Sequence, residues 1–169
     1  MNESFLERAK GIKAFFFDMD GVLTDGKVLV MQNGDLLRQM NVRDGFALKT
    51  LSRKGYIGAI ISAGYSEGAV MRFKGFGLKE VHMNADPKLA VFNDILERNK
   101  LNASEVLYMG DDVADIECLK TAGIAVSPAD ASSEVLPYAD YITEFTGGNA
   151  AVREVVELVL KAQDNWDFV

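Results

Sequence analysis

Short apolar runs, each separated from the next by a helix-like segment, place the strongest limit on the fold of this chain. AFFFD (14–18) is a continuous apolar run that closes on an acid, which is typical of a strand buried on both faces of a parallel sheet. YIGAIIS (56–62) and VLYMGDD (106–112) share this character. Shorter strands are predicted at 124–126 and 141–143.

Helix signals fill the intervals between these runs. Helices are predicted over 45–54, 67–76, 86–99 and 150–163, and a further one follows the third strand as far as Gly123. In the 86–99 helix, Asp86 is the expected N-cap and Pro87 the first helical residue. KVLVMQNGDLLRQM (27–40) predicts a hairpin flap that turns at Asn33-Gly34. This alternation indicates an α/β fold with a doubly wound parallel sheet.

Composition limits the class of protein. The 169 residues, 49% hydrophobic and 25% charged, fit a single globular domain spanning 1–169. The net charge of −7, without a cluster of Lys and Arg, disfavours nucleic acid or an anionic membrane as a partner. One Cys and one His exclude a disulfide framework, a Cys/His zinc site and most Cys–His or Ser–His catalysis. We therefore expect carboxylates and lysines to carry any chemistry.

The two ends of the sequence have different characters. The N-terminal MNESFLERAKGIK is charged and has no apolar core, so we expect no secretory signal and a cytoplasmic protein. No stretch approaches the roughly 20 apolar residues of a membrane span. Residues 162–169 resemble a tail, but Trp166 and Phe168 are unusual in a solvated end and indicate that it docks on a surface.

Polar residues follow the predicted strands at the edge where such sheets bind ligands. They are Asp18, Asp20, Ser62 and Asp111, with Lys88 at the start of a helix. Taken singly, each has a structural explanation. A DxDG motif is usually a cap or turn, and a lysine in a first helical turn opposes the helix dipole by only a few tenths of a kcal/mol, which a solvated side chain avoids.

Taken together, these residues point to phosphoryl transfer. Carboxylates at one sheet edge repel each other unless a divalent cation lies among them, and Mg²⁺ prefers oxygen ligands. A lysine and a hydroxyl beside that ion supply the charge neutralisation and positioning that a transferring phosphoryl group needs. Because no Cys–His or Ser–His pair is available, the natural nucleophile is an aspartate, which would form an aspartyl phosphate.

The motifs also resemble a known family. FFFDMDGVLTDG, Ser62, Lys88 and YMGDDVADIECL are similar to the four ordered motifs of the haloacid dehalogenase (HAD) phosphohydrolases, over about 14–160 of the chain. DGVLTDGKV, NVRDGFALK (41–49) and GGNAAVREV (147–155) are similar to the 3-deoxy-D-manno-octulosonate 8-phosphate (KDO8P) phosphatases. The resemblance implies hydrolysis of a sugar-acid phosphate in lipopolysaccharide precursor synthesis.

The resemblance also implies a role for each matched residue. Asp18 would attack phosphorus and bind magnesium. Asp20 would protonate the leaving oxygen and later activate water, with its backbone carbonyl on the metal. Ser62 would hydrogen-bond the phosphoryl group, Lys88 would offset its charge, and Asp111 would complete the magnesium ligands.

Further residues are implied around this centre. Asp112 and Asp115 are expected to hold the ligands in place. Contacts with substrate are expected from Asn41, Val42, Arg43, Asp44, Gly45, Lys49 and Arg72. Arg72 is equally well interpreted as an exposed helix residue.

The spacing of the motifs indicates a member without a cap domain. The interval between Asp20 and Ser62 holds only the hairpin and one helix, and that between Ser62 and Lys88 holds one helix and a short strand. Water must then be excluded in another way. The resemblance implies a homotetramer in which the hairpin and the tail of one subunit lie near the site of another, although either segment could simply pack on its own core.

The substrate is where this sequence departs from the family pattern. KDO8P phosphatases usually follow the hydroxyl of the second strand with Gly-Arg, whereas this chain has Ala63-Gly64-Tyr65. A lost charge-assisted contact to the substrate carboxylate matters by roughly 1.5–3 kcal/mol. Arg72, Lys49 or Arg43 could take over that contact, or Tyr65 could shape the pocket for another sugar acid. KDO8P is the leading substrate, and a nine-carbon keto-deoxy acid 9-phosphate is the alternative.

Two alternative functions also fit part of the pattern. A two-component receiver domain has similar groups around magnesium, but its phosphoacceptor lies near the middle of the chain. A HAD-like module retained only for assembly is disfavoured because every catalytic position is kept. His82 and Cys118 have no partner motif and are interpreted as structural. The Gly-rich turn at 147–149 is only weak evidence for a phosphate contact.

Overall fold

The computed structural model describes residues 3–168, whose elements alternate as the sequence predicts. The helices are α1 (Glu3–Ala9), α2 (Val42–Arg53), α3 (Glu67–Gly75), α4 (Lys88–Asn99), α5 (Ile116–Thr121) and α6 (Ala151–Ala162). The strands are β1 (Ala14–Phe17), β2 (Leu29–Val30), β3 (Leu36–Leu37), β4 (Ile57–Ile61), β5 (Glu80–His82), β6 (Val106–Met109), β7 (Ile124–Ser127) and β8 (Tyr141–Ile142). Short 3₁₀ turns lie at Ala103–Glu105, Val113–Asp115 and Leu136–Tyr138.

The central sheet has the strand order β5-β4-β1-β6-β7-β8, and all its pairings are parallel. Phe17, the last residue of β1, is in register with Ile60 of β4 and Met109 of β6. The three strands therefore end together, and the polar residues after them emerge at one edge. The predicted doubly wound parallel sheet is confirmed.

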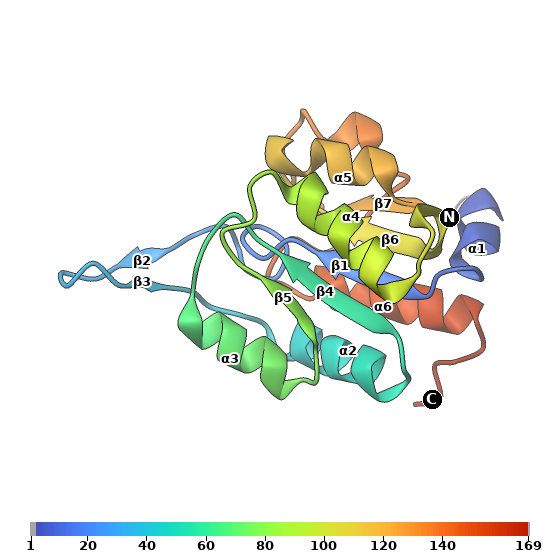
Figure 1. The fold of residues 1–169 in the computed structure, drawn as a ribbon, viewed down its shortest axis with the longest axis horizontal. Helices are drawn as coiled ribbons and strands as arrows, with labels where there is room; N and C mark the ends of the chain where they lie inside the picture. Colours follow the sequence, from blue (N-terminus) through green and yellow to red (C-terminus); the bar gives the residue numbers. More distant parts are fainter. Residues whose placement is uncertain (1–2, 169) are drawn as a thin grey trace.

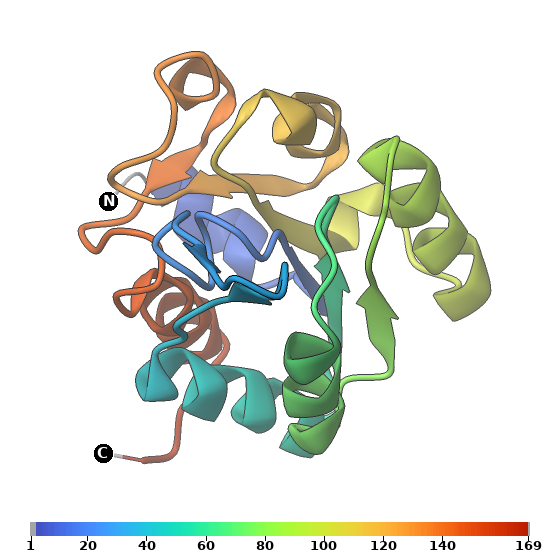
Figure 2. The same cartoon turned by 90° about the vertical axis from the view of Figure 1, so that its left-hand side faces the viewer.

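Helices cover both faces of this sheet (Figures 1 and 2). Phe15 and Phe17 point into one core cluster, which α1, α2, α3 and α6 complete, while Phe16 points into the other, beneath α4 and α5. All three rings are fully buried, and burying such a side chain contributes about 1.5–3 kcal/mol. Burial on both faces explains why β1 is apolar throughout rather than alternating.

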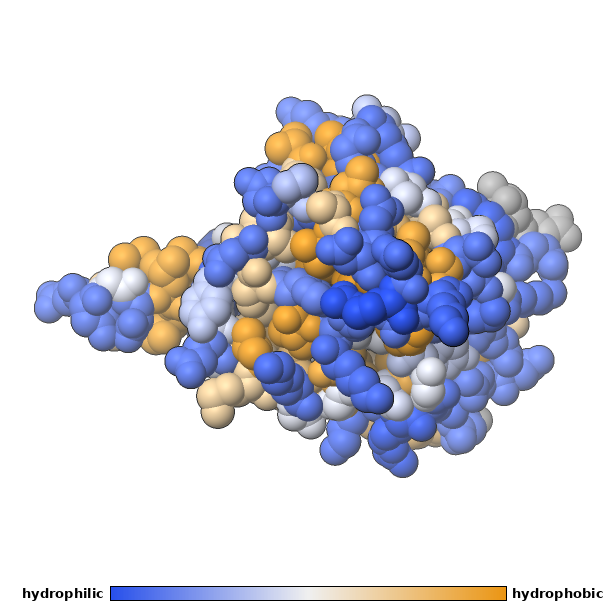
Figure 3. Space-filling model, in the orientation of Figure 1, coloured by the Kyte–Doolittle hydropathy of each residue, from blue (hydrophilic) through white to orange (hydrophobic). Residues whose placement is uncertain are grey.

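The predicted hairpin forms an arm that projects far from the body of the molecule (Figure 1). We call residues 27–40 the hairpin arm. Its strands β2 and β3 pair antiparallel, with Leu29 opposite Leu37 and Val30 opposite Leu36. These apolar side chains are exposed and form a hydrophobic patch along the arm (Figure 3). The arm is therefore an unusually apolar surface for a chain in solution.

Two helix starts and one additional helix differ from the sequence-based expectations. Helix α2 begins at Val42 rather than at residue 45, because the Asn41 side chain caps it by accepting from the backbone N–H of Arg43. The N-cap of α4 is Pro87, and the helix begins at Lys88, so Asp86 is not the cap. Pro87 itself has an extended backbone, with φ −75° and ψ 139°, so the first helical residue is the one after it. Helix α1 was not predicted.

Residues 3–168 bear on two further expectations, which concern a cap domain and a membrane-spanning helix. The intervals after β1 and β4 contain only the hairpin arm, α2, α3 and β5, and no cap domain is evident in that part of the chain. No helix of the described residues is both long and apolar enough to cross a bilayer.

Candidate active site

The carboxyl ends of β1, β4 and β6 bring the predicted catalytic groups together. The backbone N–H groups of Asp18 and Ser62 still donate to the neighbouring strands, at Met109 and His82, which holds both residues in register one position beyond the strand ends. Both side chains are buried. The sheet thus fixes the nucleophile candidate and the hydroxyl by backbone hydrogen bonds.

Lys88 reaches this edge from the first turn of α4. Its Nζ lies 2.9 Å from Asp18 Oδ2 and 2.7 Å from Asp115 Oδ1, and the residue is only 4% exposed. Burial by itself lowers the pKa of a lysine, but the charges of Asp18 and Asp115 outweigh it and hold the pKa of Lys88 above its usual value. The interpretation of Lys88 as a solvated surface residue is therefore wrong.

Asp115 holds this arrangement in place through both of its carboxylate oxygens. Oδ1 accepts from Lys88 Nζ and from the Tyr108 hydroxyl, at 2.7 and 2.6 Å. Oδ2 accepts from the backbone N–H groups of Asp111 and Asp112, at 3.1 and 3.3 Å. A Cβ at Gly110 would collide with the Asp115 side chain, so glycine is needed for this close approach. The carboxylate of Asp112 instead caps the following 3₁₀ turn.

The carboxylates of the cluster outnumber its positive charge. Burial, followed by the negative charge of Asp115, raises the pKa of Asp18 to about 7 despite the neighbouring Lys88. Burial, followed by the charge of Asp18, raises the pKa of Asp111 to about 8. Lys88 alone does not offset these carboxylates. A cation among them would favour their ionised forms.

The residues present fit a magnesium ion. Carboxylate oxygens of Asp18, Asp111 and Asp115 lie within 4.8 Å of one another. Oδ1 of Asp111 is buried, with no hydrogen-bond partner among the described residues. Each oxygen of Asp115 already accepts two hydrogen bonds, whereas each oxygen of Asp18 has a single donor. Asp18 and Asp111 are therefore the carboxylates that would hold the ion, in an oxygen-only set that Mg²⁺ prefers. Gly21 leaves room for the Asp111 carboxylate, which a Cβ there would strike.

Asp20 has a partner that the sequence did not reveal. Arg38, at the base of the hairpin arm, donates from Nε to Oδ1 at 2.8 Å and from Nη2 to Oδ2 at 3.0 Å. The Thr24 hydroxyl is 3.3 Å from Oδ1. The only sequence signal for Arg38 was a cation that directly follows the apolar pair Leu36-Leu37.

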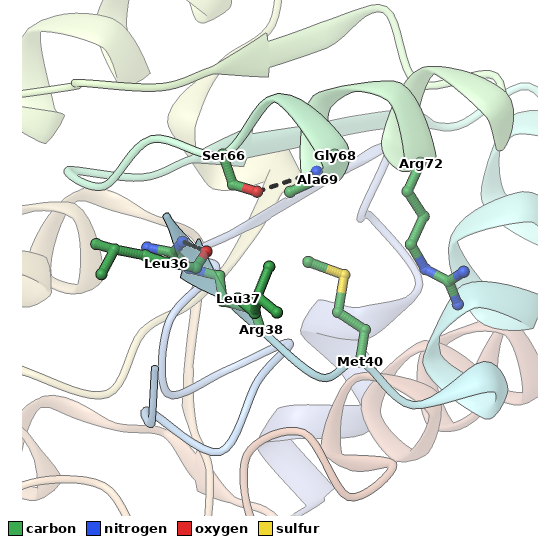
Figure 4. Close-up of a pocket in the computed structure, with 8 residues that line it drawn as sticks. All are labelled: Leu36, Leu37, Arg38, Met40, Ser66, Gly68, Ala69 and Arg72. Carbon is green, nitrogen blue, oxygen red and sulfur yellow. Dashed lines mark hydrogen bonds between the residues drawn. The ribbon is translucent and has the colours of Figure 1, made fainter. Parts of the chain in front are cut away.

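A cavity of about 340 Å³ lies between the hairpin arm and α3 (Figure 4). It is lined by Leu36, Leu37, Arg38, Met40, Ser66, Gly68, Ala69 and Arg72. Its volume is within the range of small-molecule sites. Arg38 connects it to Asp20, so the cavity adjoins the catalytic edge of the sheet.

Comparison with known proteins identifies the family. A family model described as haloacid dehalogenase-like hydrolase matches residues 35–128. The 3-deoxy-D-manno-octulosonate 8-phosphate phosphatase of Escherichia coli (strain K12) is 35% identical over 162 residues, which are 96% of this chain and 86% of that protein. The chain belongs to the KDO8P phosphatase family. The corresponding Yersinia pestis protein is 33% identical over 96% of this chain and 87% of its own length.

Solved structures of KDO8P phosphatases have the same fold. The Yersinia pestis structure matches with a TM-score of 0.96 at 32% identity, over 99% of this chain and 91% of that one. The Moraxella catarrhalis structure, a complex with magnesium ion, phosphate ion and KDO, matches with a TM-score of 0.95 at 35% identity, over 99% and 96%. The resemblance seen in the motifs is therefore confirmed, and the receiver-domain alternative is wrong.

The NVRDG motif of this KDO8P phosphatase family member lies on the first turn of α2. Asp44 is only 1% exposed and accepts from the backbone N–H groups of Ala150 and Arg153 at the start of α6. A Cβ at Gly45 would lie 2.8 Å from the Phe76 ring, so Gly45 permits close packing of α2 on α3. Both residues, expected to contact substrate, have structural roles that involve no ligand.

The other expected substrate contacts are spread over different surfaces. Asn41 caps α2, and Val42 and Lys49 are exposed on that helix. Arg43 lines a separate cavity beside α6. Arg72 is exposed on α3, stacks over Phe76 and lines the same cavity as Arg38. Of the three cations proposed for the substrate carboxylate, only Arg72 lines the cavity next to Asp20.

The Gly-rich turn at 147–149 packs on the catalytic loop. A Cβ at Gly147 would collide with the carbonyl oxygen of Gly21, and the Gly148 N–H donates to the carbonyl of Val22 at 2.9 Å. The close approach that these glycines permit is therefore to the backbone that follows Asp20. His82 pairs with Glu80, and Cys118 is buried in the core, which agrees with their structural interpretation.

The C-terminal tail packs on the body of the same chain. Trp166 is buried against Phe46 of α2, and the Arg153 guanidinium lies 4.6 Å from the centre of its ring. Lys54 Nζ lies 2.7 Å from Asp167. These contacts account for the aromatic residues of the tail within one chain.

Proposed function

We propose that this chain is a magnesium-dependent phosphatase that hydrolyses KDO8P to KDO and inorganic phosphate through an aspartyl phosphate. The observation that carries the proposal is the buried Asp18–Lys88–Asp115 arrangement at the end of β1, beside Asp111 and Ser62. The KDO8P phosphatases to which the chain is similar supply the substrate.

In the first step, Asp18 attacks the phosphorus atom, and the bond from phosphorus to the sugar oxygen breaks. Lys88, held by Asp115, offsets charge on both the nucleophile and the transferring group, and Ser62 hydrogen-bonds a phosphoryl oxygen. A bound magnesium ion supplies further charge neutralisation when Asp18 and Asp111 hold it, with the backbone carbonyl of Asp20 as the expected third protein ligand.

Asp20 moves the protons. It donates one to the leaving sugar oxygen in the first step. In the second step, it accepts a proton from the water that attacks the aspartyl phosphate, which releases phosphate and restores Asp18. Its contacts with Arg38 and Thr24 fix the carboxyl group beside the arginine that lines the cavity.

The hairpin arm supports a homotetramer as the working assembly. The apolar side chains of the arm are exposed to water, which is unfavourable. A neighbouring subunit that buried them would also close the cavity beside Asp20 against water. We further propose that the enzyme acts as a single domain in the cytoplasm, without a nucleic-acid or membrane partner.

Turnover by the purified chain tests this function. With Mg²⁺, we expect KDO8P to be hydrolysed with a higher kcat/KM than either a nine-carbon keto-deoxy acid 9-phosphate or p-nitrophenyl phosphate, and we expect a chelator to abolish the reaction. A preference for the nine-carbon substrate would overturn the choice of KDO8P. Absence of turnover on all three substrates would favour the assembly-module alternative.

A further inference from the structure

Arg38 connects the hairpin arm to two loops of the candidate active site. Its Nε and Nη2 donate to the two carboxylate oxygens of Asp20, at 2.8 and 3.0 Å. Its Nη1 donates to the backbone carbonyls of Leu36 and Tyr65, at 3.3 and 3.4 Å. Leu36 belongs to β3 of the arm, and Tyr65 lies in the loop after β4. A single guanidinium therefore ties the arm to the loops that follow β1 and β4.

The exposures of Arg38 and Asp20 separate their roles. The Arg38 side chain is only 6% exposed, whereas that of Asp20 is 32% exposed. The backbone at Gly64 packs directly against the pair: a Cβ there would lie 3.0 Å from Asp20 Oδ2 and 3.2 Å from Arg38 Nη2, closer than ordinary van der Waals contact. The guanidinium is thus enclosed behind the carboxyl group, and Asp20 is the member of the pair that a substrate reaches.

A guanidinium in this position favours proton donation by Asp20. As the bond from phosphorus to the leaving oxygen breaks, its electron pair goes to that oxygen, which takes the proton of Asp20. Negative charge then develops on the two carboxylate oxygens that accept from Arg38. A bidentate contact with arginine is stronger for a carboxylate than for the neutral acid. Because the contact strengthens as the proton leaves, it stabilises the transition state more than the ground state.

We propose that Arg38 is a positioning residue for Asp20, which orients the carboxyl group toward the leaving oxygen and stabilises the negative charge that remains after proton transfer. This inference rests on the proposed phosphatase function and gives the hairpin arm a part in the proton-transfer step. Arg38 acts here through Asp20 and not through a contact with substrate. Its loss therefore matters most for esters whose leaving group has to be protonated.

Two esters of similar size test this dependence on the leaving group. p-Nitrophenolate departs as a stable anion, whereas phenolate is more basic and depends more on a proton donor. We expect Arg38→Gln to lower kcat/KM about tenfold more for phenyl phosphate than for p-nitrophenyl phosphate, a part of the roughly 10²–10⁴-fold that general acid–base catalysis contributes. Arg38→Lys keeps the charge without the planar fork and should fall between wild type and Arg38→Gln.

A double-mutant cycle with Asp20→Asn tests whether Arg38 acts through Asp20. The first step is followed in a single turnover, as release of p-nitrophenolate or phenol, because the later hydrolysis of the aspartyl phosphate also depends on Asp20. In the Asp20→Asn background, Arg38→Gln should change the rate by about twofold or less, because the group that it positions is gone. Effects of the two substitutions that simply multiply would show that Arg38 acts independently, which would overturn the inference.

The matched control is Arg98→Gln, which removes an arginine that is 55% exposed at the far end of α4 and should leave the ratio of the two kcat/KM values unchanged. Thermal unfolding measures any loss of structure that follows from the broken contacts with Leu36 and Tyr65. Equal losses on the two phenyl esters in Arg38→Gln would mean that Arg38 only anchors the arm or binds the phosphoryl group. Either result would overturn the positioning role.

Failure of the proposed function is distinguishable from failure of this inference. A wild-type protein that hydrolyses neither phenyl ester nor KDO8P in the presence of Mg²⁺ would overturn the phosphatase function, and the role of Arg38 with it. A wild-type protein that hydrolyses these esters, together with losses in Arg38→Gln that do not depend on the leaving group, would overturn the role of Arg38 alone.

Discussion

Lys88 Nζ lies 2.9 Å from the Asp18 carboxylate, and both residues are almost completely buried at the end of β1. A lysine in a first helical turn opposes the helix dipole by a few tenths of a kcal/mol. Pairing with Asp18 and with Asp115 more than offsets that cost. The pair therefore connects the position of α4 to the position of the nucleophile.

Asp18→Asn is expected to abolish turnover, because an amide is not a nucleophile and is a weaker metal ligand. The fold should persist, because the side chains are nearly isosteric and Asn removes a buried charge. Steady-state kinetics and circular dichroism check both points. Asp94→Asn, at an exposed position on α4, is the matched control and should behave as wild type. Substantial activity in Asp18→Asn would contradict the mechanism.

Lys88→Ala is expected to lower kcat about 10²-fold or more, because a charge contact in the transition state is lost. It should also destabilise the fold by about 3–5 kcal/mol, because Asp18 and Asp115 would be left buried without their cation. Kinetics and urea unfolding measure the two effects. Lys120→Ala, on the exposed side of α5, serves as control. A change in kcat of less than about threefold would argue against a catalytic role.

Magnesium is expected to stabilise the protein as well as activate it. Binding at 100 times the dissociation constant adds about 2.7 kcal/mol to the free energy of unfolding. Asp111→Asn should abolish most of this gain while raising the melting temperature of the metal-free protein, because it removes one of the carboxylates that repel each other. Calorimetry with and without Mg²⁺ checks both changes. An equal magnesium-induced shift in wild type and variant would exclude Asp111 as a ligand.

Asp44→Ala separates a structural role from a substrate contact. Both of its oxygens accept from backbone N–H groups at the start of α6, so the variant should lose about 1–3 kcal/mol of stability with little change in KM. Urea unfolding and kinetics provide the two readouts. Asp35→Ala, at the exposed tip of the arm, is the control. A large rise in KM at unchanged stability would instead support the substrate contact expected from the motif.

Val30→Asp is expected to dissociate the proposed tetramer, because it places a charge within the exposed apolar patch of the hairpin arm. Light scattering at micromolar concentration reports the mass, and kinetics report the effect on the site. Gln32→Glu adds a negative charge at a polar position of the same arm and should leave the assembly intact. A monomeric wild type with full activity would show that no neighbouring subunit is needed.

Local patterns were sufficient for most of the fold. The apolar runs around Phe16 and Tyr108 indicate strands because a short run that is apolar throughout and ends in turn residues is typical of a strand buried on both faces. The Asn33-Gly34 dipeptide predicts the turn of the arm because glycine adopts the positive φ that it needs. Boundaries near Val42 and Lys88 were missed, because they depend on the Asn41 cap and on the extended backbone of Pro87 rather than on periodicity.

The contacts around the site join residues that are distant in the sequence, and no local sequence pattern reveals such contacts. Asp44 meets the start of α6 more than a hundred residues later in the chain, and Arg38 reaches Asp20 only because the second strand of the arm returns the chain to the catalytic loop. The glycines at 110 and 147 give a partial signal, since a glycine indicates a close approach but does not say which residue comes close.

The sequence by itself determined the alternation of strands and helices, and placed an acid, a hydroxyl or a lysine at the end or start of particular elements, because these are properties of neighbouring residues. Only the tertiary structure decided which of those groups meet. The parallel register brings Asp18, Ser62 and Asp111 to one edge, and Asp115 is engaged as a support rather than left free as a ligand. These outcomes depend on close packing and on competition for hydrogen-bond partners, which operate between residues that are distant in the chain.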